Sequence, residues 1–318
     1  MNQKNLKNDL TILVCSCDAY EDLWMPFFTL LKRYWSPLDI HIIFNVETKD
    51  FSMDGLDIQC VHSPGEKRYG QRMLNALDSV KTKYVLLLLD DFFLREPVCE
   101  ETIKQIVSWM DADENIVYFN CDSFNTYVDC ETNNYPGFKR LPHASDYMLN
   151  MQAAIWQTEM LKSFWRPDAS PWEWESLYNV LAFKYPQYKF YCAKKAEDAF
   201  LQYGHYKFGD IWGVYRGKWV IEDVGPLFEK EKIDVDFSVR GIYSRGEPIK
   251  RSRKTFSDIL HRCRIFCQIR KWYELPLYVG SEVRRIIKNS LNDPTEDNYL
   301  TYIMKKERER FISSMKKK

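Results

Sequence analysis

An α/β fold, with a mostly parallel β-sheet flanked by helices and a helical C-terminal extension, is the architecture that this sequence predicts. Two observations support it. Short apolar, β-prone runs alternate with amphipathic segments over the first third of the chain, and this order builds parallel sheets covered by helices on both faces. Tyr84–Leu89 is so uniformly apolar that neither face of that strand can be exposed to water. With 318 residues, the chain is long enough to bury a substantial core.

Four strands and two helices are expected in the first third of the chain. After the first strand, Leu23, Phe27 and Leu30 recur at helical spacing. Pro26 lies in the same segment and is tolerated only in the opening turn of a helix. Strands are predicted at Thr11–Cys17, Asp39–Val46, Leu56–His62 and Tyr84–Leu89, and helices at Asp22–Tyr34 and Gln71–Val80.

The middle of the chain mixes helix with loop, and it contains no repeat or low-complexity tract. A basic stretch around Arg245–Lys254 marks a linker, so we expect a domain over residues 1–245 and a basic helical extension over residues 246–318. In the middle region we predict helices at Glu101–Met110, Gln152–Phe164 and Glu173–Phe183, a strand at Ile116–Asn120, and a polar loop over the sheet edge at Asp122–Pro142.

The formal net charge is zero, with 45 Lys and Arg against 45 Asp and Glu, so whole-molecule charge predicts no nucleic-acid partner. The charge is unevenly distributed. Residues 250–318 carry 18 basic against 8 acidic side chains, and residues 1–249 carry 27 against 37. Phe256–Trp272 is a basic amphipathic segment, typical of a helix at an anionic membrane surface. Docking of this segment on the acidic body is an equally good interpretation.

The lack of a recognisable targeting signal and the pattern of cysteines predict a cytoplasmic protein. The N-terminal stretch lacks the long apolar region of a secretory signal, and the longest strongly apolar run is too short to span a membrane. The nine cysteines include no CxxC pair, so neither a disulfide framework nor a zinc site is expected. If the basic extension binds lipid, the protein would be peripheral at the inner face of the cytoplasmic membrane.

Two adjacent carboxylates, Asp90 and Asp91, directly follow the apolar run Tyr84–Leu89. In open parallel sheets, ligands bind beyond the carboxyl ends of the strands. Mg²⁺ and Mn²⁺ take oxygen ligands, commonly one or two carboxylates together with substrate phosphates. The pair therefore predicts a divalent-cation site, with a solvated turn at the strand end as the alternative.

Four patches of the sequence resemble a family of bacterial GT-A glycosyltransferases that assemble capsular and other surface polysaccharides. They span roughly residues 10–225 in the order that the family shows. The patches are Cys17–Phe28 (CDAYEDLWMPFF) with Tyr34–Pro37 (YWSP), Leu86–Leu94 (LLLLDDFFL), Asn150–Leu161 (NMQAAIWQTEML) and Ser170–Glu175 (SPWEWE).

This resemblance implies a Rossmann-like GT-A domain that binds a nucleotide-sugar donor, most readily a UDP-sugar, together with Mn²⁺ or Mg²⁺. The GT-A metal element is Asp-x-Asp, whereas this chain has Asp90-Asp91-Phe92. We therefore expect Asp91 to be the metal ligand and Asp90 to assist it. The resemblance also suggests that His205 contacts metal or phosphate, with an ordinary surface histidine as the alternative.

Other side chains are candidates for donor binding. Asp18 and Tyr20 resemble the GT-A residues that meet the base and ribose, although Asp18 could instead cap a helix and Tyr20 could pack in the core. The remaining candidates are Asn45 and Glu47 after the second strand, Arg72 as a phosphate ligand or a surface arginine, and Lys218 near the diphosphate.

Ser170–Glu175 offers the acid–base group. An inverting glycosyltransferase needs one carboxylate to take the proton of the acceptor hydroxyl. On a helix Glu173 and Glu175 point about 200° apart, so only one is expected to face the cleft. Trp172 and Glu175 are three residues apart and share a face, which would place a sugar platform beside a base. We therefore expect Glu175 rather than Glu173, with a charged helix start as the alternative.

The predicted activity is transfer of a sugar to a glycan or lipid-linked oligosaccharide acceptor, with inversion. Two alternatives remain. A sugar nucleotidyltransferase shares the nucleotide-binding architecture, but it should carry a glycine-rich loop after the first strand, where this chain has Cys17-Asp18-Ala19-Tyr20. A degenerate, non-catalytic glycosyltransferase acting as a scaffold or partner subunit would explain the incomplete Asp-x-Asp element.

Overall fold

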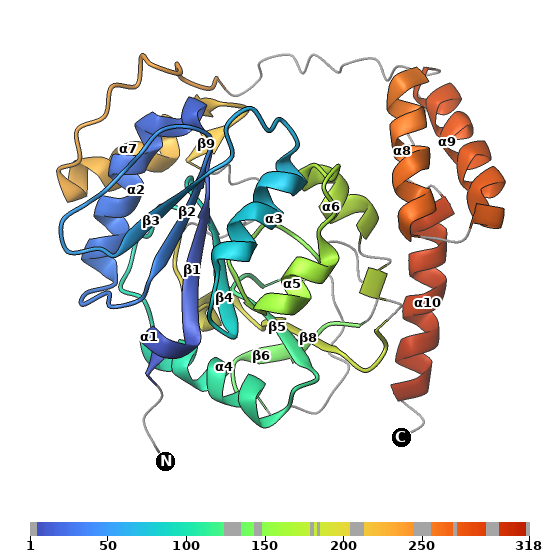
Figure 1. Ribbon diagram of the computed structural model, residues 1–318, viewed down its shortest axis with the longest axis horizontal. Coiled ribbons are helices and arrows are strands. Elements are labelled where there is room, and N and C mark those ends of the chain that lie inside the picture. Colours follow the sequence, from blue (N-terminus) through green and yellow to red (C-terminus); the bar gives the residue numbers. More distant parts are fainter. Residues whose placement is uncertain are drawn as a thin grey trace.

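The computed structural model describes residues 5–123, 135–142, 148–178, 181–182, 185–203, 213–244, 256–269, 272–290 and 299–315. A central β-sheet carries helices on both faces (Figure 1). Its strands are β1 (Leu10–Cys15), β2 (Ile42–Val46), β3 (Ile58–His62), β4 (Tyr84–Leu89), β5 (Ile116–Asn120), β6 (Phe138–Arg140), β7 (Ala154–Gln157) and β8 (Lys189–Ala193), and β9 (Val214–Tyr215) pairs with β10 (Lys218–Trp219) in a separate ribbon.

Within the described residues, eight strands form the sheet in the order β3-β2-β1-β4-β7-β5-β8-β6. The first four strands are mutually parallel. Strand β7 runs antiparallel to both β4 and β5, β8 is parallel to β5, and β6 is antiparallel to β8. The predicted α/β class, with a mostly parallel sheet flanked by helices, is confirmed, and the arrangement is Rossmann-like as the resemblance implied.

Helices cover both faces of the sheet. They are α1 (Leu6–Asp9), α2 (Glu21–Tyr34), α3 (Tyr69–Ser79), α4 (Glu100–Ala112), α5 (Thr158–Phe164), α6 (Pro171–Leu177) and α7 (Ile221–Glu231). One core packs the sheet against α2, α4 and α7, and the other packs it against α3, α5 and α6. Alternate residues of β1 and β4 enter opposite cores and are buried, as a strand sandwiched between two helical layers requires.

The strands and helices predicted up to residue 120 are present; β4 and β5 have the predicted bounds, and the other elements have shifted ends. Pro26 lies in the second turn of α2, one turn later than expected. The predicted helix at Gln152–Phe164 is wrong in its first half, because Ala154–Gln157 forms β7 between β4 and β5. Helix α6 begins at Pro171 and ends at Leu177. The predicted loop Asp122–Pro142 contains β6 at the sheet edge.

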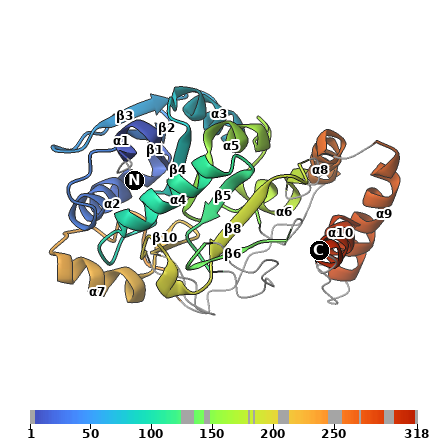
Figure 2. The same cartoon turned by 90° about the horizontal axis from the view of Figure 1, so that it is seen from below.

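The C-terminal extension is helical, as predicted. Helices α8 (Phe256–Ile269), α9 (Leu275–Ser290) and α10 (Tyr299–Met315) pack successively on one another at one end of the molecule (Figures 1 and 2). Phe266 of α8 stacks on Tyr278 of α9 with ring centroids 4.5 Å apart. Among the described residues, none of the helices has the length and apolar character that crossing a membrane would need.

Candidate active site

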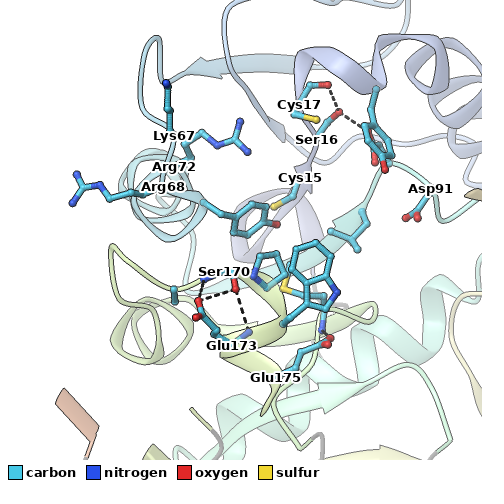
Figure 3. A pocket seen from close by; sticks show the side chains of 18 of the residues that line it. Cys15, Ser16, Cys17, Lys67, Arg68, Arg72, Asp91, Ser170, Glu173 and Glu175 are labelled. Carbon is cyan, nitrogen blue, oxygen red and sulfur yellow. Dashed lines mark hydrogen bonds between the residues drawn. The ribbon is translucent and has the colours of Figure 1, made fainter. Parts of the chain in front are cut away.

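A cavity of about 620 Å³ opens at the carboxyl ends of β1 and β4. This volume is within the usual range of small-molecule sites, and the location is the edge where open α/β sheets bind ligands. The walls come from the residues after β1 and β4, the start of α3, the segment before β7, helix α6, and one residue of α8. Figure 3 shows Lys67, Arg68 and Arg72 on one side of the cavity, with Asp91 and Glu175 on the other.

Asp90 and Asp91 line the cavity at the end of β4. Ser16, directly after β1, donates a hydrogen bond from its hydroxyl to Asp90. The indole of Trp24 in turn donates to the Ser16 hydroxyl oxygen at 2.6 Å. Asp91 Oδ1 is buried and accepts no hydrogen bond from the described residues. The strand end therefore presents one carboxylate that is held in place and one whose buried oxygen lacks a donor.

Burial makes both carboxylates reluctant to ionise. It raises the pKa of Asp90 well above its ordinary value, and the neighbouring Asp91 raises it further, while the bond from Ser16 and the charge of Arg240 act in the opposite direction. Burial likewise raises the pKa of Asp91 to about 6, with Arg240 again opposing. A cation bound between the two carboxylates would relieve both the desolvation and the repulsion.

The residues present fit a divalent cation. The donor set consists of carboxylate oxygens, which Mg²⁺ and Mn²⁺ prefer. Asp91 lines the cavity, and its buried Oδ1, which accepts no hydrogen bond from the described residues, is a candidate ligand atom.

Arg240 ties the segment after α7 to the start of α2. Its guanidinium forms an ion pair with Asp22, including an Nε–Oδ2 contact of 2.8 Å, and donates to the carbonyl oxygen of Ala19 at 3.2 Å. The same group lies 4.4 Å from the centroid of the Tyr20 ring, a cation–π distance. Tyr20 lines the cavity and Arg240 does not. Arg240 therefore holds the Tyr20 ring in place from outside the cavity.

On the basic side, a chain of contacts holds Arg72. Glu47 forms an ion pair with the Arg72 guanidinium at 2.5 Å and accepts from the backbone N–H of Asp18 at 3.2 Å. Asp18 in turn accepts from the backbone N–H groups of Glu47 and Thr48 at 3.2 and 3.1 Å. Arg72 is buried but lines the cavity. Asp18 and Glu47 do not line the cavity; they hold Arg72 in place through hydrogen bonds and the ion pair.

The opposite wall is the short helix α6. Ser170 caps it, because its hydroxyl accepts from the N–H of Glu173 while the Glu173 carboxylate accepts from the N–H of Ser170 at 3.0 Å. This is a capping box, which fixes the start of a helix. The other oxygen of Glu173 contacts Nε2 of His261, from α8, at 2.9 Å. Both oxygens of Glu173 therefore have structural partners.

Glu175, two residues after Glu173, also lines the cavity. Its Oε1 accepts from the backbone N–H of Met151 at 2.8 Å. Burial raises the pKa of Glu175, and the bond from Met151 only partly offsets this effect, so the carboxylate is more basic than one in water. Glu173 and Glu175 both line the cavity, against the expectation that only one could, because Glu173 folds back over the helix start.

Trp172 is 76% exposed at the cavity mouth, whereas Trp165 and Trp174 are buried and stack with parallel rings 4.7 Å apart. A large exposed aromatic ring beside a cavity is suited to contact with a ligand. His261 lines the same part of the cavity, so the C-terminal extension contributes a residue to its wall.

The predicted site residues divide into two groups. The cavity brings together Tyr20, Arg72, Asp90, Asp91, Glu173 and Glu175. Four others are outside its lining: Asn45 is buried at the end of β2, Asp18 and Glu47 stand behind Arg72, and Lys218 is in the β9–β10 ribbon. His205 is outside the described residues.

Sequence reasoning missed Ser16, Lys67, Arg68, Arg240 and His261. Ser16 had a usable signal, since it directly follows β1 at the edge that was inspected. Lys67 and Arg68 precede α3 and could have been considered with Arg72. Arg240 and Asp22 are 218 residues apart, and no local pattern links them.

No protein-family model matches this chain, and neither does any curated protein. Several solved structures are similar to it at low identity. S. aureus TarS in complex with UDP-GlcNAc is 11% identical, covers 88% of this chain and 73% of its own, and gives a TM-score of 0.44. Another TarS structure is aligned over 61% of its length.

Two further structures come from other organisms. The mannosyltransferase PcManGT from Pyrobaculum calidifontis, in complex with GDP-Man and Mn²⁺, is 12% identical, with coverage of 58% and 54% and a TM-score of 0.38. A cytidylyltransferase from Leptospira borgpetersenii is 10% identical, with coverage of 77% and 100% and a TM-score of 0.38. All these similarities are low, and they assign no function to this chain.

Proposed function

We propose that this protein is a glycosyltransferase that moves a sugar from a nucleotide-sugar donor, a UDP-sugar for preference, to an acceptor hydroxyl. One observation carries the proposal. An acidic pair after β4, Asp90 and Asp91, and a separate half-buried carboxylate on α6, Glu175, line the same cavity. Sugar transfer needs both groups, because the leaving diphosphate requires charge neutralisation and the attacking hydroxyl requires a base.

In the proposed reaction, Glu175 takes the proton of the acceptor hydroxyl as its oxygen attacks the anomeric carbon. The bond between that carbon and the diphosphate breaks, and the nucleoside diphosphate leaves with the bonding electron pair. Attack from the face opposite the leaving group inverts the configuration. The raised pKa of Glu175, caused by its burial, makes this carboxylate a stronger base.

Binding of the donor would use the other walls. Tyr20 offers a ring for the base, and Arg72 with Lys67 offers positive charge to the diphosphate. Mn²⁺ or Mg²⁺ bound by Asp91 with Asp90 would neutralise charge on the departing diphosphate. Asp18 and Glu47 would act indirectly, by holding Arg72 in place.

Trp172 and the C-terminal helices suggest the acceptor side. The exposed ring of Trp172 beside Glu175 would stack on a sugar of a glycan or lipid-linked oligosaccharide. Leu260 and Leu277 are exposed on helices α8 and α9, within an extension rich in Lys and Arg. Peripheral binding to the anionic inner face of the cytoplasmic membrane would bring a lipid-linked surface-polysaccharide intermediate to the site.

A thermal-shift screen of nucleotide sugars tests the proposal. UDP, UDP-sugars, GDP-Man and CDP are compared with and without Mn²⁺, since a ligand at about 100 times its Kd stabilises the folded state by about 2.7 kcal/mol. We expect one nucleoside diphosphate to raise the Tm in the presence of Mn²⁺, and its sugar conjugate to be turned over.

Three other outcomes contradict the proposal. A non-catalytic scaffold would bind the nucleotide without any turnover. A nucleotidyltransferase would release pyrophosphate from a nucleoside triphosphate and a sugar phosphate. Absence of stabilisation by every nucleotide, with the protein folded, would remove nucleotide-sugar chemistry altogether.

A further inference from the structure

A second group of candidate metal ligands, outside the lining of the cavity, consists of two residues of β3 and one residue of the loop before it. Asp50, Cys60 and His62 each place one ligand atom within 4.8 Å of the others. Cys60 and His62 are two residues apart on a strand and therefore share a face. Asp50 and His62 are exposed and Cys60 is half-buried, so the group can be reached from solvent.

Packing of the intervening loop holds Asp50 near Cys60. The Phe51 ring stacks on Phe28 at 4.9 Å and meets Phe44 edge-on at 6.1 Å, which anchors the loop in the core. The Phe51 N–H donates to Cys60 Sγ at 3.3 Å, and the Cys60 thiol donates to the Phe51 carbonyl oxygen at 3.4 Å. The backbone beside Asp50 is therefore fixed against the sulfur.

His62 completes the group. Its Nε2 lies 3.2 Å from Asp50 Oδ1 and 3.1 Å from the Lys49 carbonyl oxygen. Without a metal, Nε2–H donates to these oxygens. A proton thus occupies the position between nitrogen and carboxylate that a cation could take.

We propose that Asp50, Cys60 and His62 bind Zn²⁺. Thiolate, imidazole and carboxylate are the protein ligands of zinc, and three of them with one water form a common tetrahedral set. Zinc–ligand bonds of about 2.0–2.3 Å place donor atoms roughly 3.3–3.8 Å apart. The three ligand atoms lie within 4.8 Å of one another, so small side-chain movements would bring them to these distances. On binding, the Cys60 proton leaves to solvent and the His62 proton moves to Nδ1, and the two anionic ligands balance the charge of the ion.

Zinc at this position would stiffen the loop that supports the cavity. Lys49 and Thr48, next to Asp50, donate backbone hydrogen bonds to Asp18. Glu47, at the start of the same loop, pairs with Arg72. The proposed zinc site does not depend on the proposed sugar transfer, because it uses none of the cavity residues.

The experiment is a Zn²⁺ titration of the chelator-treated full-length chain against a chromophoric competitor. We expect one zinc ion whose affinity is at least tenfold lower in Cys60→Ser and in His62→Ala, whereas zinc held by Asp90 and Asp91 should be unaffected by either substitution. Co²⁺ in place of Zn²⁺ should give a thiolate-to-metal charge-transfer band that Cys60→Ser abolishes. Melting curves of both variants without metal verify that they are folded, and the Cys60→Ser substitution changes only one atom.

His41 provides the matched control. It contacts Asp57 at 2.9 Å and Gln59 at 3.2 Å and belongs to no group of three candidate metal ligands among the described residues. Its side chain is 34% exposed against 33% for His62. His41→Ala should leave the zinc affinity unchanged. Zinc binding that persists in Cys60→Ser, that disappears in Asp91→Asn instead, or that is absent from the wild-type chain would overturn the proposal.

Discussion

The two halves of the sheet deliver their functional groups to the same edge by opposite routes. In the parallel half, β1 and β4 both end at the cavity, so residues directly after the strands, Ser16 and Asp91, line it. In the mixed half, β7 runs antiparallel to β4. The residues before β7, not after it, therefore reach the cavity, and Met151 there binds Glu175 through its backbone.

The two halves of the sheet place different carboxylates at the cavity. The parallel half places an acidic pair at the end of β4, in which Asp90 is buried and Asp91 half-buried, and burial raises the pKa of both carboxylates. The mixed half presents a single basic carboxylate on a short helix whose start is fixed by a capping box. The proposed function predicts different kinetic signatures for substitutions in the two halves.

Glu175→Gln should produce the largest effect. The amide keeps the size of the side chain but cannot accept the proton of the acceptor hydroxyl, so transfer should fall about 10³-fold. Stabilisation by UDP with Mn²⁺ should persist, because the donor contacts belong to the other half of the sheet. Steady-state transfer and thermal shift of the same preparation measure the two effects.

Glu173→Gln is the matched substitution for this prediction. Gln keeps the capping box and weakens only the contact with His261. Its effect on transfer should be far smaller than that of Glu175→Gln. An equal or greater loss in Glu173→Gln would assign the base to Glu173 and contradict the separation drawn here.

Asp91→Asn should give the opposite signature. Loss of the carboxylate removes a cation ligand, so we expect transfer to fall about 10²-fold and Mn²⁺ to stop raising the Tm. The proton-accepting group is untouched, so the remaining activity should no longer respond to EDTA. Wild-type activity that is equally insensitive to EDTA would remove the cation from the mechanism.

Sequence patterns locate cavity residues where a local rule applies. Asp90 and Asp91 follow a fully apolar strand and line the cavity, and so does Glu175, which helical spacing places near Trp172; their roles stay predictions. Strand β7 was mistaken for helix, because pairing with β4 and β5 overrode the local pattern. Local patterns of apolar residues do not reveal which strands flank a segment.

Contacts between distant segments were beyond the sequence. Arg240 approaches Tyr20 only because the chain returns after α7 to the start of α2. Cysteine spacing alone predicted no zinc site, whereas the fold brings Cys60 and His62 to Asp50 through an anchored loop. Each of these contacts depends on tertiary packing.

The acidic pair should also affect stability as the pH changes. Burial raises the pKa of Asp91 in the folded state from 3.8 to about 6, so the folded chain binds this proton more tightly than the unfolded chain. The resulting stabilisation is complete below about pH 4 and is lost as the pH rises through 6. Metal-free Asp91→Asn should therefore be more stable than wild type at pH 7.5, on the order of 2 kcal/mol.

Denaturant unfolding of both chains at pH 4 and pH 7.5 measures this difference. The comparison cancels most other carboxylates, which titrate alike in the two chains. At pH 4 the two free energies of unfolding should converge. A gap that is constant across the pH range would mean that Asp91 is not strained by burial.

Arg240→Lys should give the smallest effect, confined to the nucleotide side of the cavity. Lys keeps the charge but loses the two-pronged contact with Asp22 and the planar stacking on Tyr20. Tyr20 should then hold the nucleotide base less well, and UDP affinity in the presence of Mn²⁺ should fall up to tenfold. Calorimetric titration with UDP measures the change.

Arg33→Lys is the control. Arg33 joins α2 to the end of α7 through an ion pair with Glu231 at 3.1 Å, and it is not among the residues that line the cavity. If both variants weaken UDP binding equally, Arg240 only supports the fold, and its proposed positioning of Tyr20 is wrong.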